Sequence, residues 1–338
     1  MTPAHQIQVG DCLELLRAMP DRSVHCCITS PPYYGLRDYG VDGQIGLEET
    51  PAGFIARLVE VFREVHRVLR DDGTCWINMG DSYAGSWGAQ GRPQGNGQMS
   101  GRSVASARQI NEHPRFKTGT GVRGREIGLK AKDLMGIPWR LAFALQDDGW
   151  YLRQDIIWHK PNPMPESIKD RCTKAHEYLF LLSKSRRYYF DQEAIAEPSV
   201  EPRGPGNTNP ISSLPGERAS QNSNIRGSIH KIGPRETRNR RSVWSVATAP
   251  FSGAHFATFP LELIRPCVLA GAPRGGLVLD PFGGAGTTGL VAMQEGRNSV
   301  LLELNPQYAA IARTRLAAAW LEGAAQMDVL LDTKEPAA

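Results

Sequence analysis

The stretch that decides the fold is 277–289, LVLDPFGGAGTTG, in which a short apolar run leads into a glycine-rich turn. Gly284, Gly286 and Gly289 satisfy the pattern GxGxxG, and Glu303 lies 19 residues beyond Gly284 at the end of the next predicted strand. Strand, turn, helix, strand and acid in this order predict a site for an adenosine-containing cofactor. The lysine of a nucleoside-triphosphate loop is absent, so NAD and S-adenosylmethionine are the two cofactors left open.

Each part of this motif has a physical reason. Glycines let the backbone approach a ligand closely, and the N-terminus of the following helix favours an anion. Glu303 can accept hydrogen bonds from both hydroxyls of a ribose.

Working outward, apolar periodicity predicts strands that alternate with helices. Strands are predicted at 5–9, 23–29, 74–79, 150–159, 177–183, 276–280 and 299–303, and helices at 12–19, 51–70, 133–147, 260–270, from about 287 and from 306. The helix at 51–70 is expected to stop at Asp72-Gly73, and Pro138 fits a helix only if it falls in the first turn or kinks the helix. This alternation predicts an α/β fold with an open, doubly wound, mostly parallel sheet covered on both faces.

The composition is that of an ordinary globular protein, with 338 residues of which 41% are apolar. It excludes collagen-like, coiled-coil and wholly disordered chains. No apolar run approaches the length of a membrane span, and the N-terminus lacks the layout of a secretory signal. The six cysteines form no CxxC pair, so we expect a reduced, cytoplasmic protein without a metal site.

The formal net charge of +4 conceals an uneven distribution. Residues 84–130 hold eight Lys or Arg against two Glu, and residues 198–245 hold eight against three. The remainder of the chain therefore carries a net charge of −7. Both basic stretches are rich in Gly, Ser, Asn, Gln and Pro, which is typical of loops that become ordered on a polyanion, although solvated surface loops have the same composition.

A second motif, TSPPYY at 29–34, follows the buried strand predicted at 23–29. Two consecutive prolines fix the backbone and cannot donate hydrogen bonds, so a hydroxyl and a carbonyl point outward beside an aromatic ring. A Pro-Pro turn with its tyrosines packed on the core would look the same.

Here the chain resembles the DNA methyltransferases that modify the exocyclic nitrogen of cytosine or adenine. Ser30-Pro31-Pro32-Tyr33 resembles their catalytic motif, and Asp280 to Thr288 resembles their cofactor motif. The catalytic motif comes first and the cofactor motif last, which is the order of the family's beta group. Segments 157–163 and 174–177 resemble later parts of the catalytic half.

The resemblance implies a Rossmann-like class I methyltransferase fold with S-adenosyl-L-methionine as cofactor. It divides the chain into a catalytic half at 1–83 and 131–197, a basic insertion loop at 84–130, a target-recognition region at 198–250, a cofactor-binding half at 251–323 and a C-terminal tail at 324–338.

The resemblance also assigns roles to individual residues. The catalytic residues are Ser30, Pro31, Pro32 and Tyr33. The cofactor-binding residues are Asp11, Phe256, Asp280, Pro281, Phe282, Gly284, Gly286, Thr287, Thr288 and Glu303, with the two threonines equally suited to capping the next helix. The DNA-binding residues are Arg226, Lys231, Arg235, Arg238, Arg240 and Arg241.

The implied reaction is site-specific methylation of double-stranded DNA at the N4 of a flipped cytosine, because serine before Pro-Pro is commoner among cytosine-N4 enzymes. Adenine N6 is the alternative target. An NAD-dependent oxidoreductase would explain the glycine motif alone, and a non-catalytic DNA-binding protein would need neither motif intact. A bacterial or phage-encoded enzyme acting at the nucleoid is implied, and a homodimer or a cognate restriction endonuclease stays open as a partner.

Overall fold

The computed structural model describes residues 4–35, 40–84, 129–130, 132–199, 236–248 and 259–332, with side chains described as far as 321. Most of the predicted insertion at 84–130 lies outside these ranges, and so does most of 198–250. Within the described ranges, no helix is long and apolar enough to cross a membrane.

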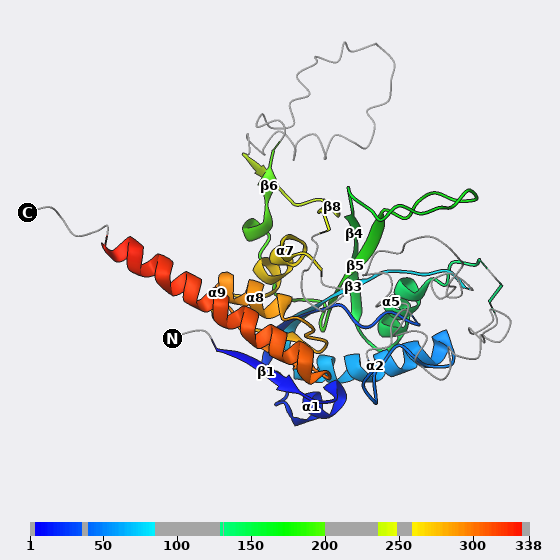
Figure 1. Cartoon of the computed structure of the whole chain (residues 1–338), viewed down its shortest axis with the longest axis horizontal. Coiled ribbons are helices and arrows are strands. Elements are labelled where there is room, and N and C mark those ends of the chain that lie inside the picture. The colour runs from blue at the N-terminus through cyan, green and yellow to red at the C-terminus, as the bar shows by residue number, and fades with distance from the viewer. Residues whose placement is uncertain are drawn as a thin grey trace, which may run out of the picture. The chain divides into compact units, whose positions relative to one another are not determined.

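The centre of the fold is an eight-stranded sheet with the strand order β1-β10-β9-β2-β3-β5-β4-β8 (Figure 1). The strands are β1 (His5–Val9), β2 (Val24–Thr29), β3 (Leu69–Met79), β4 (Tyr151–His159), β5 (His176–Ser183), β8 (Val243–Ser245), β9 (Leu277–Asp280) and β10 (Asn298–Glu303). The first five strands in the sheet order are parallel, whereas β5 is antiparallel to both β3 and β4. The predicted mostly parallel sheet is confirmed.

Helices cover both faces of this sheet, as expected for a doubly wound fold. The helices are α1 (Cys12–Ala18), α2 (Pro51–Val68), α5 (Ile137–Asp147), α7 (Leu261–Gly271), α8 (Thr287–Gln294) and α9 (Pro306–Asp332). α1, α2 and α5 pack together on one face, and α7, α8 and α9 lie on the other (Figure 1). α5 begins at Ile137 rather than at the predicted 133, which puts Pro138 in the first turn, one of the two places that were open to it.

The amphipathic pattern explains α2, the longest helix on its face. On its inner face, the side chains of Phe54, Leu58 and Phe62 are fully buried. The Thr50 side chain accepts a hydrogen bond from the Gly53 amide at 3.0 Å and so caps the first turn. Periodic burial and a capped start together place this helix against the sheet.

The predicted stop of this helix at Asp72-Gly73 is wrong. α2 ends at Val68, and β3 begins at the next residue. Val24 of β2 pairs with Leu69, whereas Cys26 pairs with Thr74, so the segment around Gly73 forms a bulge inside the strand. The turn signal was therefore real, but it marks a bulge rather than a helix end.

α9 continues through Asp332, into the segment 324–338 that the resemblance assigns to the C-terminal tail. The segment Asp191–Arg241 forms a compact unit of its own, with β6 (Glu197–Pro198) antiparallel to β7 (Thr237–Arg238). It starts before the predicted region 198–250 and ends before β8, which belongs to the central sheet.

Candidate active site

The site lies at the carboxyl ends of four neighbouring parallel strands. β1, β10, β9 and β2 end side by side, and β9 and β2 are adjacent although far apart in sequence. After β9 the chain enters α8 on one face, whereas after β2 it continues to α2 on the other (Figure 1). Such a reversal opens a crevice between the two connections, which is where parallel sheets bind ligands.

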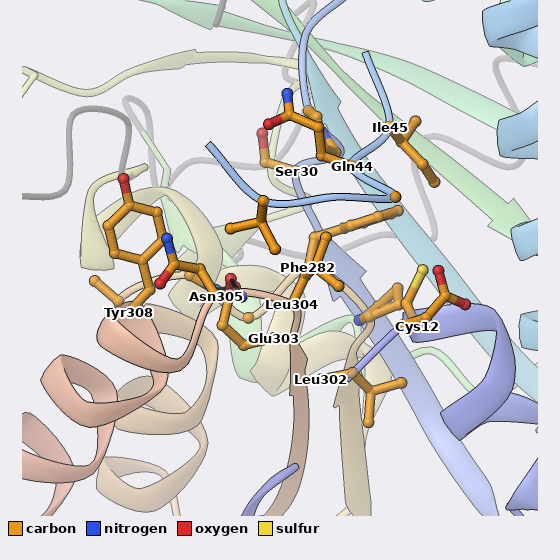
Figure 2. Close-up of a pocket in the computed structure, with 18 of the residues that line it drawn as sticks. Cys12, Ser30, Gln44, Ile45, Phe282, Leu302, Glu303, Leu304, Asn305 and Tyr308 are labelled. Carbon is orange, nitrogen blue, oxygen red and sulfur yellow. Dashed lines mark hydrogen bonds between the residues drawn. The ribbon is translucent and has the colours of Figure 1, made fainter. Parts of the chain in front are cut away.

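A pocket with an empty volume of about 920 Å³, counting space open to solvent, occupies this crevice. It brings together the two predicted motifs, since Ser30 and Pro32 line it together with Phe282, Gly284 and Glu303. Figure 2 shows Ser30 at one end of the pocket and Glu303 beyond the Phe282 ring. A polar group for a substrate and a polar cradle for an adenosine therefore share one cavity.

Glu303, at the end of β10, holds the glycine turn in place. Its Oε2 accepts a hydrogen bond from the Gly284 amide at 2.7 Å, and its Oε1 accepts one from the Asn305 amide at 2.8 Å. Burial raises the pKa of Glu303. Each carboxylate oxygen keeps a second lone pair, so the carboxylate can still accept two ribose hydroxyls.

Asp280 lies beneath the pocket, and its side chain is not among the lining groups. Its carboxylate accepts hydrogen bonds from the Thr29 and Thr288 hydroxyls, both at 2.6 Å, and from the Phe282 amide at 3.0 Å. Asp280 thus fastens the end of β2 to the start of α8 under the two motifs. Burial raises its pKa from 3.8 to about 6, although these three donors act in the opposite direction.

Replacing Asp280 with Asn is expected to change how stability depends on pH. Between about pH 4 and pH 6 the folded protein holds a proton that the unfolded chain has released, so the free energy of unfolding falls as pH rises through this window. The loss amounts to about 3 kcal/mol if the whole shift is realised. Asp280→Asn removes this titration. In urea unfolding followed by circular dichroism, the free energy of unfolding of the variant relative to that of the wild type should therefore rise from pH 4 to pH 7. Parallel stability curves would show that the pKa of Asp280 is not raised.

The glycines of the motif divide into two structural roles. Gly284, with φ of +51°, lines the pocket, where a backbone without a side chain can approach a ligand. Gly286 does not line it, and a Cβ there would lie 2.8 Å from the Cβ of Ala312 in α9. A Cβ on Gly289 would lie 2.9 Å from Leu301 in β10. The second and third glycines therefore permit close helix packing.

The two threonines at the start of α8 also differ. Thr287 lines the pocket, and its hydroxyl lies 3.3 Å from Nη1 of Arg315, which also donates to the Ala285 carbonyl. Thr288 is fully buried, and its hydroxyl donates a hydrogen bond to the Asp280 carboxylate. Neither threonine caps the helix, because the N-cap is Gly286.

Asp11 and Cys12 form the side of the pocket next to β1. One Asp11 oxygen caps α1 by accepting the amides of Leu13 and Glu14 at 2.9 and 3.1 Å. The other lies 3.9 Å from Arg57 and retains acceptor capacity. Pro281 lines the pocket too.

Tyr33, three residues after Ser30 in the motif, does not line the pocket. Its hydroxyl donates to Oε2 of Glu177 at 2.7 Å. Burial, followed by the charge of Glu177, raises the pKa of Tyr33 well above its usual value. The hydroxyl is therefore neutral at physiological pH. Pro31, which follows Ser30 in the motif, is buried.

The sequence did not reveal several lining residues. Val41, Gly43, Gln44 and Ile45 come from the loop after the catalytic motif, and Asn305 and Tyr308 come from the start of α9. Figure 2 labels Gln44 and Ser30 at the same end of the pocket. The glycines at 40, 43 and 46 were a usable signal, because Gly46, with φ of +110°, lets this loop approach the Tyr33 carbonyl.

Part of the predicted site lies outside the described residues. This applies to Phe256 and to Arg226, Lys231 and Arg235. Within the unit Asp191–Arg241, Arg238 and Arg241 both bond Glu197, at 3.1 and 3.0 Å.

A family model described as DNA methylase, covering N6 and N4 enzymes, matches residues 24–314. The chain belongs to this family. The methylase is 50% identical to the type II methyltransferase M.Cfr9I of Citrobacter freundii over 91% of this chain and 86% of that protein. It is 44% identical to M.SmaI of Serratia marcescens over 92% of this chain and 90% of that protein.

Two solved structures share the fold of the methylase. The PvuII cytosine-N4-specific DNA methyltransferase matches with a TM-score of 0.58 and 19% identity, covering 93% of this chain and 87% of that one. A putative DNA modification methylase from Thermus thermophilus, complexed with S-adenosyl-L-methionine, matches with a TM-score of 0.55 and 24% identity, covering 94% of this chain and 96% of that one. The class I methyltransferase fold is thus confirmed.

The family decides the question that the glycine motif left open. The chain is a DNA methyltransferase of the N6/N4 family, and its cofactor is S-adenosylmethionine rather than NAD. The pocket fits this cofactor, because a ribose acceptor and a bare glycine backbone lie beside the apolar side chains of Ile45, Phe282 and Leu304.

Proposed function

We propose that this methylase transfers a methyl group to the exocyclic N4 of a cytosine within a specific sequence of double-stranded DNA. The observation that carries the proposal is the position of Ser30, which lines the same pocket as Gly284 and Glu303. A hydroxyl beside the cofactor cradle suits an amino group that must be oriented rather than deprotonated first.

The amino nitrogen of cytosine is a poor nucleophile because its lone pair is delocalised into the ring. S-adenosylmethionine supplies an electrophilic methyl group when bound. The Ser30 hydroxyl and the Pro31 carbonyl accept hydrogen bonds from the two amino hydrogens, which directs the nitrogen lone pair toward the pocket. The methyl group would leave the sulfonium sulfur of the cofactor, which becomes a neutral thioether, as it bonds to the nitrogen. The nitrogen would then lose a proton to water, since serine is no strong base.

The remaining roles follow from the same pocket. Glu303 accepts the ribose hydroxyls, Asp11 faces the adenine and Thr287 contacts the methionine carboxylate. Asp280 acts indirectly, by holding β2 and α8 together beneath the cofactor. The target base leaves the helix, because its amino group is otherwise paired, and the Tyr33 ring stacks on it.

Adenine N6 is the second candidate target, since the same geometry orients either amino group. Serine at position 30 favours cytosine. Long-read sequencing of DNA from an expressing host identifies the modified base and the recognition sequence together. Modified cytosine in one short motif is the expected result, and modified adenine alone would overturn the choice of base.

The basic region after β5 is the proposed DNA reader. Reversing the charge of Arg238, Arg240 and Arg241 together is expected to weaken DNA binding and to flatten its dependence on salt, because fewer counterions are released. Fluorescence anisotropy at several salt concentrations measures both. Glu197→Gln is the matched control, since it frees Arg238 and Arg241 without removing positive charge. A salt slope identical to that of the wild type would show that these arginines do not contact DNA.

A further inference from the structure

The loop that connects β4 to β5, residues 160–175, starts at the same edge of the sheet as the pocket. β5 is antiparallel to both β3 and β4, so β4 runs parallel to β2 and β3 and ends where they end. β4 is three places from β2 in the sheet, which is about 14 Å at the usual spacing of strands. In Figure 1 this loop is drawn in green and extends away from the sheet beyond β4 and β5. It therefore lies on the side from which a duplex approaches the pocket.

Side-chain contacts anchor this loop at two points. The Asn162 side chain accepts a hydrogen bond from the Thr248 amide at 2.9 Å and donates one to the Thr248 carbonyl at 3.2 Å. Glu166 pairs with Arg171 at 2.8 Å, and the Arg171 guanidinium lies 4.1 Å from the centre of the Tyr83 ring. The short segment between Asn162 and Glu166 is thus held on either side.

This held segment displays an apolar side chain to solvent. Met164, midway between the two anchors, is 87% exposed, which is the largest exposure of any large apolar side chain in the described ranges. Pro163 and Pro165 have fixed φ angles, and Pro165 also confines Met164 to an extended conformation. A single exposed apolar residue is common on protein surfaces. Here a stiff and anchored backbone presents it at the edge of the sheet that carries the pocket.

The surroundings of Met164 are basic. The segments 130–134 and 160–175 together hold six Lys or Arg against three Asp or Glu. These segments lie side by side, because Nζ of Lys132 bonds the Asp170 carboxylate. Positive flanks suit the phosphates of a duplex, and an apolar tip between them suits the stacked bases.

We propose that Met164 is a wedge that enters the base stack of the duplex and fills the place left by the base that moves into the pocket. This rests on the proposed function, because an enzyme that methylates a paired base has to open the pair. Extruding a base costs its pairing and stacking. Methionine is among the apolar side chains that proteins insert between base steps, and its contact with the neighbouring bases offsets part of that cost. The extruded state is therefore more populated with Met164 than without it.

Met164→Ala tests this role, and the exposure of the side chain means that the fold does not depend on it. The substrate is a synthetic duplex with the sequence that is methylated in the expressing host, and tritium from labelled S-adenosylmethionine gives the single-turnover rate. We expect this rate to fall about tenfold, because alanine loses much of the apolar contact with the bases. A 2-aminopurine placed beside the target base should brighten when the wild type binds and much less when Met164→Ala binds.

A second duplex separates a wedge from a DNA contact of another kind. Opposite an abasic site the target base has no partner, so its extrusion costs less. On this duplex Met164→Ala should transfer methyl groups nearly as fast as the wild type. Met164→Leu should keep most of the rate on both duplexes, because leucine is apolar and has a similar volume.

The matched control is Leu321→Ala, which shortens another exposed apolar side chain, about 20 Å along α9 from Tyr308 of the pocket. It should match the wild type in every assay. Label found only in adenine would overturn the proposed target base and leave the rate ratios for Met164 meaningful. A Met164→Ala rate equal to that of the wild type, or the same loss on both duplexes, would overturn the wedge.

Discussion

Replacing Ser30 with Ala is expected to lower the rate of methyl transfer about 100-fold while leaving cofactor affinity unchanged. Ser30 brings one hydroxyl to the pocket, and the proposed cofactor contacts come from two other lining residues, Gly284 and Glu303. The alanine therefore removes an acceptor for the amino group and little else. Single-turnover assays measure the rate, and isothermal titration calorimetry with S-adenosylmethionine measures the affinity.

Ser23→Ala is the control for this variant, because the Ser23 hydroxyl bonds the Pro20 carbonyl at the opposite end of β2. It should match the wild type in both measurements. An equal loss of rate and cofactor affinity in Ser30→Ala would show that Ser30 holds the cofactor rather than the base.

Replacing Glu303 with Ala is expected to weaken binding of S-adenosylmethionine about 100-fold or more. Two hydrogen bonds from ribose hydroxyls to a carboxylate contribute about 3 kcal/mol together. The alanine also releases the Gly284 and Asn305 amides, which the carboxylate holds at 2.7 and 2.8 Å, so the glycine turn loses its support. Calorimetry gives the affinity, and thermal unfolding gives the accompanying loss of stability.

Glu295→Ala is the matched control for Glu303→Ala, since Glu295 ends α8 while the pocket lies at the start of that helix. It should lose some stability through Arg265 but no cofactor affinity. Retention of wild-type affinity in Glu303→Ala would place the ribose elsewhere.

Local patterns predicted most of the fold, because alternation and helical periodicity report directly on burial. They failed where one signal serves two structures. Asp72-Gly73 is a turn signal, yet its turn is a bulge within β3 opposite Val24 and Cys26 of β2. Only the pairing of two strands decides between a helix end and a bulge, and no local pattern contains that pairing.

The two motifs predicted the location of the site, but not the contacts behind it. Asp280 was expected to contact the cofactor. Its carboxylate instead lies under the pocket and accepts hydrogen bonds from the Thr29 and Thr288 hydroxyls. Its partner Thr29 is 251 positions away, so the contact depends on β9 pairing with β2. Glu177 belonged to a segment that resembled the catalytic half, yet its bond to Tyr33 required the sheet to place β5 beyond β3.

The most direct test of the proposed function uses the purified protein. Unmethylated DNA is incubated with S-adenosylmethionine that carries a deuterated methyl group, digested to nucleosides and analysed by mass spectrometry. The account predicts labelled N4-methylcytosine, and a Ser30→Ala sample with the label strongly reduced. Label in N6-methyladenine alone, or no label in DNA at all, would contradict it.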